Sequence, residues 1–391
     1  MSGPQRLLRA AAVAGVAVMA LAGCGGDSGS SASGGGDGLP GTVKITSIRQ
    51  LTGISSFAGT NAKKGMDLAL AEIAGQKFLG STTLQVDVKD SANSVQQAAS
   101  LATQAVADKS VSAVLGPEAS AQSTAISAIV QKAKIPTIYI QSGSNAVLTG
   151  DYTFRVTAPA ASYFEVAGKY LQGKSVTKAA VIYASDNPTL TLLGKTTIPD
   201  MSSKYGFSVS STDTVNATAQ DFTSFASKIA SDKPGAVFLM LQGTQDPVAI
   251  TQLKRAGYTG EIVGMSAMGS GNLKAAGTLA SGAVWPTDFS ADQSAPSSQA
   301  FVQAYQAKYG DKPNNYAAEG YDAMWYLARG IKQANSADRA KIQAGLVAVA
   351  KQGFDGAMGK LAFDGNDLRV AGTLATWDGS KEGVVDGVSG P

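Results

Sequence analysis

Short apolar runs that alternate with stretches of helical spacing most constrain how this chain folds. The first apolar runs cover residues 43–48, 84–88 and 111–115. Between the first two, Met66, Leu70 and Ile73 recur at helical intervals, and an Ala-rich stretch precedes the third. Short strands separated by helices pair in parallel through crossover connections. The pattern therefore predicts an α/β fold.

A second series of the same kind follows residue 154. Its predicted strands cover 154–156, 179–183, 207–211, 236–241, 261–264 and 282–285, with helices at 161–171, up to 205, 222–230 and 247–256. Further helices are expected at 301–309, 316–332 and 337–350, and a last strand near 373–377. Segments 95–116 and 222–243 share one pattern, a helix followed by a Lys-containing turn and a buried strand that ends in Gly. This predicts two lobes of like topology, each with its own core.

Two serine-rich loops follow neighbouring strands of the first series. Residues 111–115 lead through Gly-Pro into a helix for which Ser120 is the expected N-cap, and the strand at 135–140 ends in Gln141-Ser-Gly-Ser-Asn145. Free backbone N–H groups and the positive end of a helix dipole favour anions. Loops at the same ends of parallel strands face one crevice, which we expect to hold a ligand. The alternative is that these residues are ordinary caps and turns.

Composition excludes several classes of function. The chain has no His, which removes Ser-His-Asp and Cys-His catalysis and every His-containing metal site. The formal net charge is +3, without runs of Lys or Arg, so nucleic acid is not an expected partner. No carboxylate pair or Lys lies in a recognisable catalytic motif. We expect no enzyme activity, no cofactor and no metal.

The first 24 residues have the pattern of a lipoprotein signal peptide. Arg6 and Arg9 precede the apolar stretch 10–22, and Leu21-Ala-Gly-Cys24 resembles a lipobox. Cys24, the sole cysteine, is the expected lipidation site, so a disulfide within the chain is impossible. Residues 25–41 are rich in Gly and Ser and are expected to form a flexible tether. This predicts a protein anchored by lipid on the outer face of the cell membrane.

The chain resembles the substrate-binding proteins of branched-chain amino acid ABC importers, which have the type I periplasmic-binding fold. The motifs that carry the resemblance are Leu51-Thr-Gly53, the helical segment 65–73, Leu115-Gly-Pro117, Asp221-Phe222, Leu253-Lys-Arg-Ala-Gly257, Gly320-Tyr-Asp-Ala323 and Gly359-Lys-Leu-Ala-Phe-Asp-Gly365. Each motif is weak alone, but their order and spacing across the chain are specific.

The resemblance implies two Rossmann-like lobes joined by a hinge of three crossover strands, with a ligand cleft between them. The first lobe would hold residues 42–157 and 289–355, and the second 158–288 and 356–391. Closure on a small polar solute would present the protein to a membrane permease and its ATPase. The resemblance also implies a monomer. A sensor that signals its ligand state to a membrane receptor would share all these features and differ only in its partner.

The resemblance also implies where the ligand binds. The family's carboxylate-binding serine falls on Ser120, its second binding loop on Gln141, Ser142 and Ser144, and part of its apolar wall on Phe57. In the second lobe, the expected positions are Asn187, Thr244 and Ser266. Here the chain departs from the family, which places aromatic residues near the first two positions and an acid at the third.

An ammonium group buried without a counter-charge is strongly disfavoured. Therefore either Asp186, Asp246 or Glu118 replaces the missing acid, or the ligand is an amide, urea-like solute or carboxylate. Asp186 with Asp246 would also be the pair required by a third alternative, an extracellular hydrolase.

Overall fold

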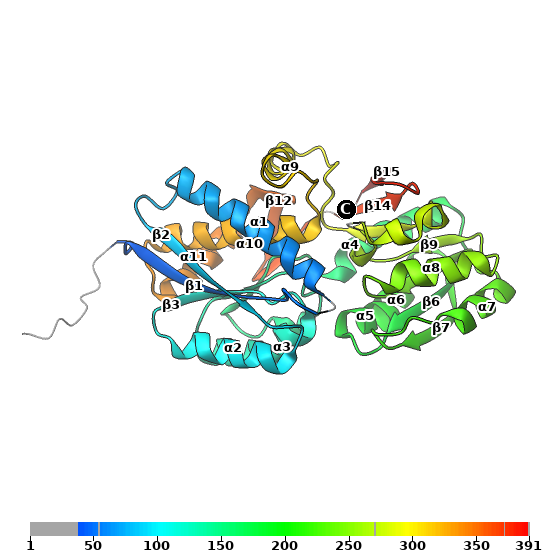
Figure 1. Ribbon diagram of the computed structural model, residues 1–391, viewed down its shortest axis with the longest axis horizontal. Helices are drawn as coiled ribbons and strands as arrows, with labels where there is room; N and C mark the ends of the chain where they lie inside the picture. The colour runs from blue at the N-terminus through cyan, green and yellow to red at the C-terminus, as the bar shows by residue number, and fades with distance from the viewer. Residues whose placement is uncertain (1–37, 54, 270, 371, 390–391) are drawn as a thin grey trace, which may run out of the picture. The chain divides into compact units, whose positions relative to one another are not determined.

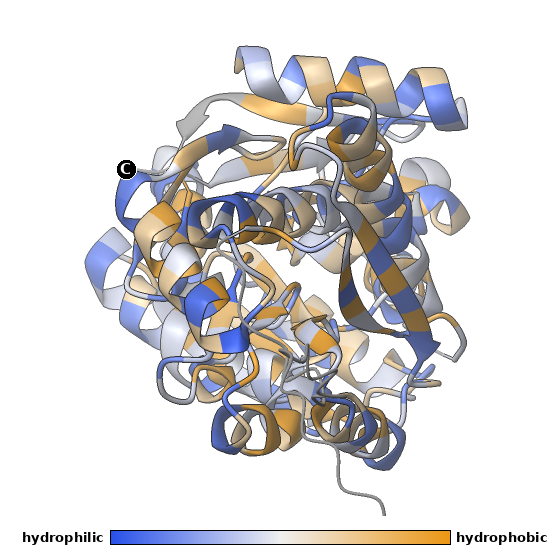
Figure 2. Ribbon diagram, turned by 90° about the vertical axis from the view of Figure 1, so that its left-hand side faces the viewer, coloured by the Kyte–Doolittle hydropathy of each residue, from blue (hydrophilic) through white to orange (hydrophobic). Residues whose placement is uncertain are grey.

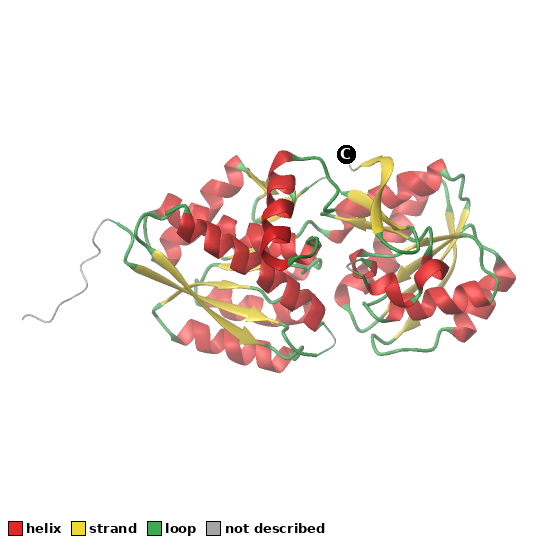
Figure 3. Cartoon of the chain, turned by 45° about the horizontal axis from the view of Figure 1, so that its top comes forward, coloured by secondary structure: helices red, strands yellow, loops and turns green. Residues whose placement is uncertain are grey.

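The computed structural model describes residues 38–53, 55–269, 271–370 and 372–389. The predicted signal peptide, Cys24 and residues 25–37 of the tether lie outside this part of the chain. Within it, no helix combines the length and apolar character needed to cross a membrane. The described residues form two mixed β-sheets with helices on both faces of each (Figure 1 and Figure 3).

The two sheets repeat one topology. The first holds β1 (Thr42–Arg49), β2 (Thr83–Asp90), β3 (Val111–Leu115), β4 (Thr137–Tyr139), β5 (Thr153–Arg155), β11 (Phe354–Gly356), β12 (Gly359–Asp364) and β13 (Asp367–Arg369). The second holds β6 (Lys178–Ala184), β7 (Ser208–Val215), β8 (Ala236–Met240), β9 (Glu261–Val263), β10 (Val284–Thr287), β14 (Thr373–Trp377) and β15 (Glu382–Ser389). Their parallel parts run β2-β1-β3-β4-β5 and β7-β6-β8-β9-β10. The prediction of two lobes of like topology is confirmed.

Helices cover both faces of the first sheet. They are α1 (Ser56–Gly75), α2 (Val95–Ala107), α3 (Ser120–Lys132), α9 (Pro296–Tyr309), α10 (Asn315–Ala334) and α11 (Arg339–Gln352). In Figure 1, α2 and α3 lie on one face, with α1, α10 and α11 on the other. Exposed helices carry hydrophilic and hydrophobic residues in bands (Figure 2), as expected when one side packs against a sheet.

The second sheet is covered by α4 (Ala160–Gly173), α5 (Pro188–Leu192), α6 (Ile198–Tyr205), α7 (Thr223–Asp232) and α8 (Gln245–Arg255). Alternate residues of β6 enter different cores: Val181 and Tyr183 join one cluster, and Ala180 and Ile182 the other. Strands buried on both faces appear as continuous apolar runs, which is why the sequence identifies them so readily.

Helices α1 and α10 pack closely because glycine lies at their contact. A Cβ on Gly65 would lie 1.8 Å from the carbonyl oxygen of Ala317, and one on Gly320 would lie 2.2 Å from that of Ala62. Neither position has room for a larger residue. This contact places Tyr316, near the start of α10, beside the first turn of α1.

The chain passes between the sheets three times, after β5, after β10 and after β13. The last crossing corrects the predicted boundary at residue 356. Residues 359–364 pair antiparallel with 367–369, and Asp367 pairs with Arg155 of β5, so this hairpin belongs to the first sheet. Its Gly- and Asp-rich sequence resembles a turn, which concealed the strands.

One helix start and one helix interior also differ from the predictions. Ala119 is the N-cap of α3, and Ser120 is the first helical residue. The long helix expected to end at residue 205 consists of α5, a π-helical turn over Leu193–Thr197, and α6.

Candidate functional site

Two cavities are lined by residues of both lobes. The inner cavity has a volume of about 190 Å³ and is lined by loops that follow parallel strands. The outer cavity has a volume of about 860 Å³ and is lined by α1, β10, the loop before α10, and the hairpin of β14 and β15. Phe57 lines both, so the two spaces adjoin at its side chain.

The inner cavity lies where this topology is expected to bind ligands. Its wall includes Gln50 after β1, Glu118 after β3 and Gln141 after β4. In the second lobe it includes Asn187 after β6, Gln242 after β8 and Met265 after β9. In both sheets the strand order reverses next to β1 or β6, and ligands of such folds bind outside the carboxyl ends of the strands at this point. The inner cavity is therefore the candidate site, although the outer one is larger.

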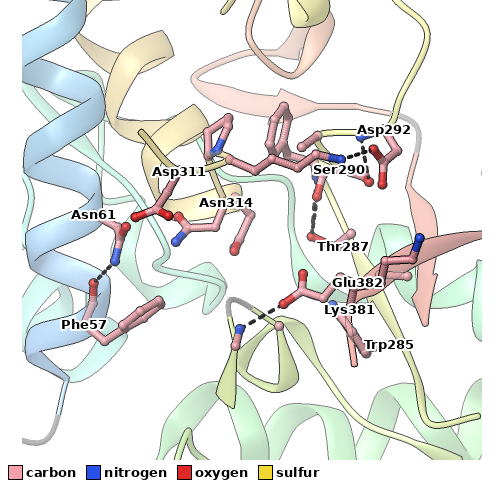
Figure 4. Close-up of a pocket in the computed structure, with 18 of the residues that line it drawn as sticks. Phe57, Asn61, Trp285, Thr287, Ser290, Asp292, Asp311, Asn314, Lys381 and Glu382 are labelled. Atoms are coloured by element: carbon pink, nitrogen blue, oxygen red, sulfur yellow. Dashed lines mark hydrogen bonds and ion pairs between the residues drawn. The ribbon is translucent and has the colours of Figure 1, made fainter. Parts of the chain in front are cut away.

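The outer cavity has a lining of mixed chemical character, with aromatic, polar and charged side chains (Figure 4). Phe57 and Asn61 of α1 lie on one side, and Trp285 and Glu382 of the second sheet on the other. Ion pairs within it are exposed, such as that between Lys312 Nζ and Asp292 Oδ1 at 2.6 Å. Exposed pairs are screened by water and contribute little binding energy. We interpret this cavity as the mouth of the cleft.

Ser120 lies on the wall of the inner cavity, as predicted. Its hydroxyl is 2.8 Å from the hydroxyl of Thr189 in the other lobe and accepts a hydrogen bond from the backbone N–H of Ser144. The first turn of α3 thus contacts the second lobe directly. A ligand bound at this helix terminus would replace the Thr189 hydroxyl as the partner of the Ser120 hydroxyl.

Ser142 and Ser144 do not line either cavity. The Ser142 hydroxyl is fully buried, 2.6 Å from that of Ser123, and donates to the carbonyl oxygen of Glu118. The Ser144 hydroxyl accepts from the backbone N–H of Ala146. Both side chains therefore hold the loop in place behind the wall, which corrects their assignment as ligand contacts.

Gln141 lines the inner cavity and is held by a buried acid. Its backbone has a positive φ of 52°, and its N–H donates to Glu319 Oε2 at 2.7 Å. Its side-chain amide also donates to Glu319, and the Thr157 hydroxyl donates to the same carboxyl group. Glu319 thereby links this loop to the first crossover between the lobes.

Phe57 contributes to the apolar wall, as predicted. It is 40% exposed, and its ring meets that of Tyr316 edge-on, with centroids 5.9 Å apart. Tyr316 also lines the inner cavity, although no motif in the sequence indicates a role for it. An aromatic residue near the start of a helix carries no signal of a ligand site until the helix is placed against the cleft.

All three positions predicted in the second lobe line the inner cavity. The Asn187 side-chain oxygen accepts from the N–H groups of Thr189 and Leu190, so it caps α5 as well. Ser266 is 4% exposed, and Thr244 precedes the first residue of α8. The lobe-two wall thus offers neutral polar groups where the family pattern has aromatic and acidic ones.

The structure distinguishes the three acids that were expected to replace the missing one. Asp186 is exposed, lines neither cavity, and accepts from the backbone N–H of Ala217. Glu118 lines the inner cavity, but Arg49 Nη1 donates to it at 2.8 Å, so its charge is balanced. Asp246 is fully buried, and neither carboxyl oxygen has a hydrogen-bond partner. An exposed and a buried acid do not form the carboxylate pair of a hydrolase.

A further pair of acids lies at the second crossover. Burial raises the pKa of Glu319 well above its ordinary range, and the neighbouring Asp288 raises it further. Burial likewise raises the pKa of Asp288. Among the residues the structure describes, no group of three or more acidic or Cys side chains is arranged to hold a metal ion.

Comparisons with known proteins agree with this architecture. The leucine-, isoleucine-, valine-, threonine- and alanine-binding protein of Pseudomonas aeruginosa is 26% identical over 333 residues, which are 83% of this chain and 86% of that protein. The structure of LivJ from Streptococcus pneumoniae with isoleucine has a TM-score of 0.79 at 24% identity, covering 88% of this chain and 99% of that one. A solute-binding protein of R. palustris with benzoate has a TM-score of 0.79 at 20% identity, covering 88% and 95%.

These structural similarities establish the type I periplasmic-binding fold. A family model described as periplasmic binding protein matches residues 42–380, which include every strand of the two sheets except β15 and every residue of the inner cavity. Since that match covers most of its length, the chain belongs to the periplasmic binding protein family.

Proposed function

We propose that this protein is the extracytoplasmic solute-binding component of an ABC importer. It captures a small polar solute between its lobes and delivers it to a membrane permease. The observation that carries the proposal is the inner cavity, where loops after strands of both sheets meet around one space lined by both polar and apolar groups. A solute bound there contacts both lobes at once, so its binding energy favours the closed form over an open one.

The proposed solute is an amino acid or a related amide or carboxylate. A cavity of about 190 Å³ is smaller than the usual site of a drug-sized ligand, which suits a solute of this size. The names of similar proteins point to the same classes, since one is named for leucine, isoleucine, valine, threonine and alanine, and another was solved with benzoate. Hydroxyl and amide groups on the wall supply the hydrogen bonds that such polar solutes require.

A thermal-shift screen of the purified protein tests the proposal. The panel contains amino acids, their amides, short carboxylates, benzoate and urea. A ligand present at 100 times its Kd stabilises the folded state by about 2.7 kcal/mol, which is a shift of several degrees in Tm. We expect at least one class to give this shift. The absence of any shift across the panel at millimolar concentrations would contradict the proposal.

We also propose that Cys24 carries the lipid anchor. The support is its position at the end of the lipobox, ahead of a Gly- and Ser-rich tether that would keep the binding domain off the membrane. Acyl chains on Cys24 would hold the protein at the membrane surface. Cys24→Ser should therefore move the protein from the membrane fraction to the soluble fraction. Retention of the variant in membranes would contradict the anchor.

A further inference from the structure

The loop that follows β4 forms part of the inner cavity through a single residue in an unusual backbone conformation. Of residues 140–144, Gln141 alone lines the inner cavity. Its φ of 52° lies in the left-handed region, which residues other than Gly rarely adopt. Such a conformation persists only where the surrounding structure fixes it. The groups that contact Gln141 from behind therefore decide whether this part of the cavity wall forms.

The carboxyl group of Glu319 on α10 is the main group behind Gln141. Glu319 is fully buried, and its Oε2 accepts a hydrogen bond from the backbone N–H of Gln141 at 2.7 Å. The side-chain amide of Gln141 donates to the other oxygen, Oε1. One carboxyl group thus fixes both the backbone and the side chain of Gln141. Glu319 lines neither the inner nor the outer cavity, so it acts on a solute only through its neighbours.

The same carboxyl group contacts the first crossover between the lobes. The Thr157 hydroxyl donates to Glu319 Oε2 at 2.5 Å and accepts from the backbone N–H of Gln141 at 2.5 Å. Thr157 follows β5, is 3% exposed and lines neither cavity. A residue of the crossover therefore shares its hydrogen bonds with a residue of the cavity wall.

A buried guanidinium group connects the next part of the loop to another crossover. Arg155 Nη1 donates to the carbonyl oxygens of Ser142 and Ser144, at 3.1 Å each. Its Nε and Nη2 donate to Asp367 at 2.6 and 2.8 Å. Asp367 belongs to β13, the last strand before the chain crosses to the second sheet for the third time. Arg155 is fully buried, so water does not compete for these hydrogen bonds.

We propose that Glu319 is a positioning residue for solute binding, which holds Gln141 in the wall of the inner cavity and couples it to the first crossover through Thr157. The inference rests on the proposed function and adds to its site a residue that touches no solute. Rotation of the lobes moves the crossovers, and the hydrogen bonds of Thr157 carry that movement to Gln141. Loss of the carboxyl group releases Gln141 from its left-handed conformation and leaves this part of the wall incomplete.

Asp322 provides a matched control on the same helix. It is also fully buried, and its carboxyl group accepts from the backbone N–H groups of Ala357 and Met358 at 2.7 and 2.9 Å. Neither of those residues lines the inner or the outer cavity. Asp322→Ala should therefore lower stability and leave solute affinity unchanged, whereas Glu319→Met should lower solute affinity.

Hydrogen exchange in the ligand-free protein tests the hold on Gln141. Exchange of backbone N–H groups is followed by mass spectrometry in peptides that cover residues 138–146. In Glu319→Met this segment should exchange about 10-fold faster than in the wild type, because the N–H of Gln141 has lost its acceptor. In Asp322→Ala the faster exchange should appear at residues 357–358 instead. Wild-type exchange of residues 138–146 in Glu319→Met would overturn the inference.

Calorimetry tests the effect on a solute. The probes are the amino acids, amides, carboxylates and urea of the thermal-shift panel, starting with L-leucine and benzoate. For the probe that binds most tightly, Glu319→Met should weaken binding by about 10-fold and Thr157→Val by about 3-fold. Thr157→Val keeps the shape of a side chain that lies outside both cavities, so its effect comes from the crossover. Wild-type affinity in either variant would overturn the inference.

A second substitution separates positioning from general damage to the fold. Gln141→Gly allows a positive φ without strain, so the backbone of residue 141 no longer needs Glu319 to hold it. In this background, Glu319→Met should weaken binding by less than about 2-fold, measured against Gln141→Gly alone. An undiminished loss of affinity would show that Glu319 acts on the whole lobe, and would overturn the inference alone. A panel in which nothing binds the wild type would instead refute the proposed function, and the inference with it.

Discussion

The burial of Asp246 makes a prediction that needs no ligand. Its carboxyl group is fully buried without a hydrogen bond, and burial raises its pKa well above the ordinary range. In an unfolded chain the same group ionises near pH 4. Between these two pKa values the folded chain binds a proton that the unfolded chain has released. The free energy of unfolding therefore falls as pH rises through this window.

The magnitude follows from proton linkage. One proton bound by the folded state alone changes the free energy of unfolding by about 1.4 kcal/mol per pH unit. The side chain of Asp246→Asn cannot ionise. The free energy of unfolding of this variant should therefore equal that of the wild type at pH 4 and exceed it by about 1.4 kcal/mol for each pH unit above pH 4. For about 350 residues, the part of the chain that the structure describes, the entropy of unfolding converts this gain to about 2 °C in Tm per pH unit.

The assay is thermal unfolding of the ligand-free wild type, Asp246→Asn and Asp186→Asn between pH 4 and pH 6. Other titrating groups are common to the proteins, so the difference in Tm between Asp246→Asn and the wild type isolates one carboxyl group. Asp186→Asn controls for the loss of an acid elsewhere on the lobe. If the Tm difference between Asp246→Asn and the wild type stays constant over this range, Asp246 is hydrated or paired, and our account of it is refuted.

Three further variants test the site and its scaffold. Ser120→Ala should weaken binding of the best solute by about 1–3 kcal/mol in calorimetry while leaving Tm within a few degrees, and unchanged affinity would remove this hydroxyl from the site. Asp322→Ala leaves two buried N–H groups between β11 and β12 without their acceptor and should lower the free energy of unfolding, measured with urea, by about 2–4 kcal/mol. Unchanged stability would show that water replaces the carboxyl group as the acceptor. Gly320→Ala would force α10 away from the Ala62 carbonyl and should lower the free energy of unfolding by about 1–3 kcal/mol. The control is Gly75→Ala, whose added Cβ meets no neighbouring atom and should leave stability unchanged. Equal stability of the two variants would contradict the close packing of α1 and α10.

Most of the fold can be predicted from the sequence because its signals are local. Strands buried on both faces are continuous apolar runs, and helices show their period of 3.6 residues without reference to neighbours. The strands whose sequences are Gly- and Asp-rich are the exception. The hairpin at 359–369 resembles a turn, and its membership of the first sheet depends on pairing with β5, some 200 residues earlier in the chain.

The candidate site is predicted less completely, because a loop residue's role depends on which way its side chain faces. Ser142 and Ser144 lie in the predicted loop but face away from the cavity. Tyr316 and Thr189 line it without any signal in their own sequence neighbourhoods. Contacts such as that between Ser120 and Thr189 join the two lobes, and no local pattern encodes them.

The sequence by itself determined the α/β class, the two similar lobes and the strand ends at which the candidate site lies. These follow from hydrophobic periodicity, which each segment carries independently. Only the tertiary structure decided which acid is left without a partner. Asp186, Glu118 and Asp246 are equivalent in the sequence, but one is exposed, one is paired with Arg49, and one is buried alone. The physical reason is that burial and ion pairing depend on segments that meet only when the lobes fold and pack together.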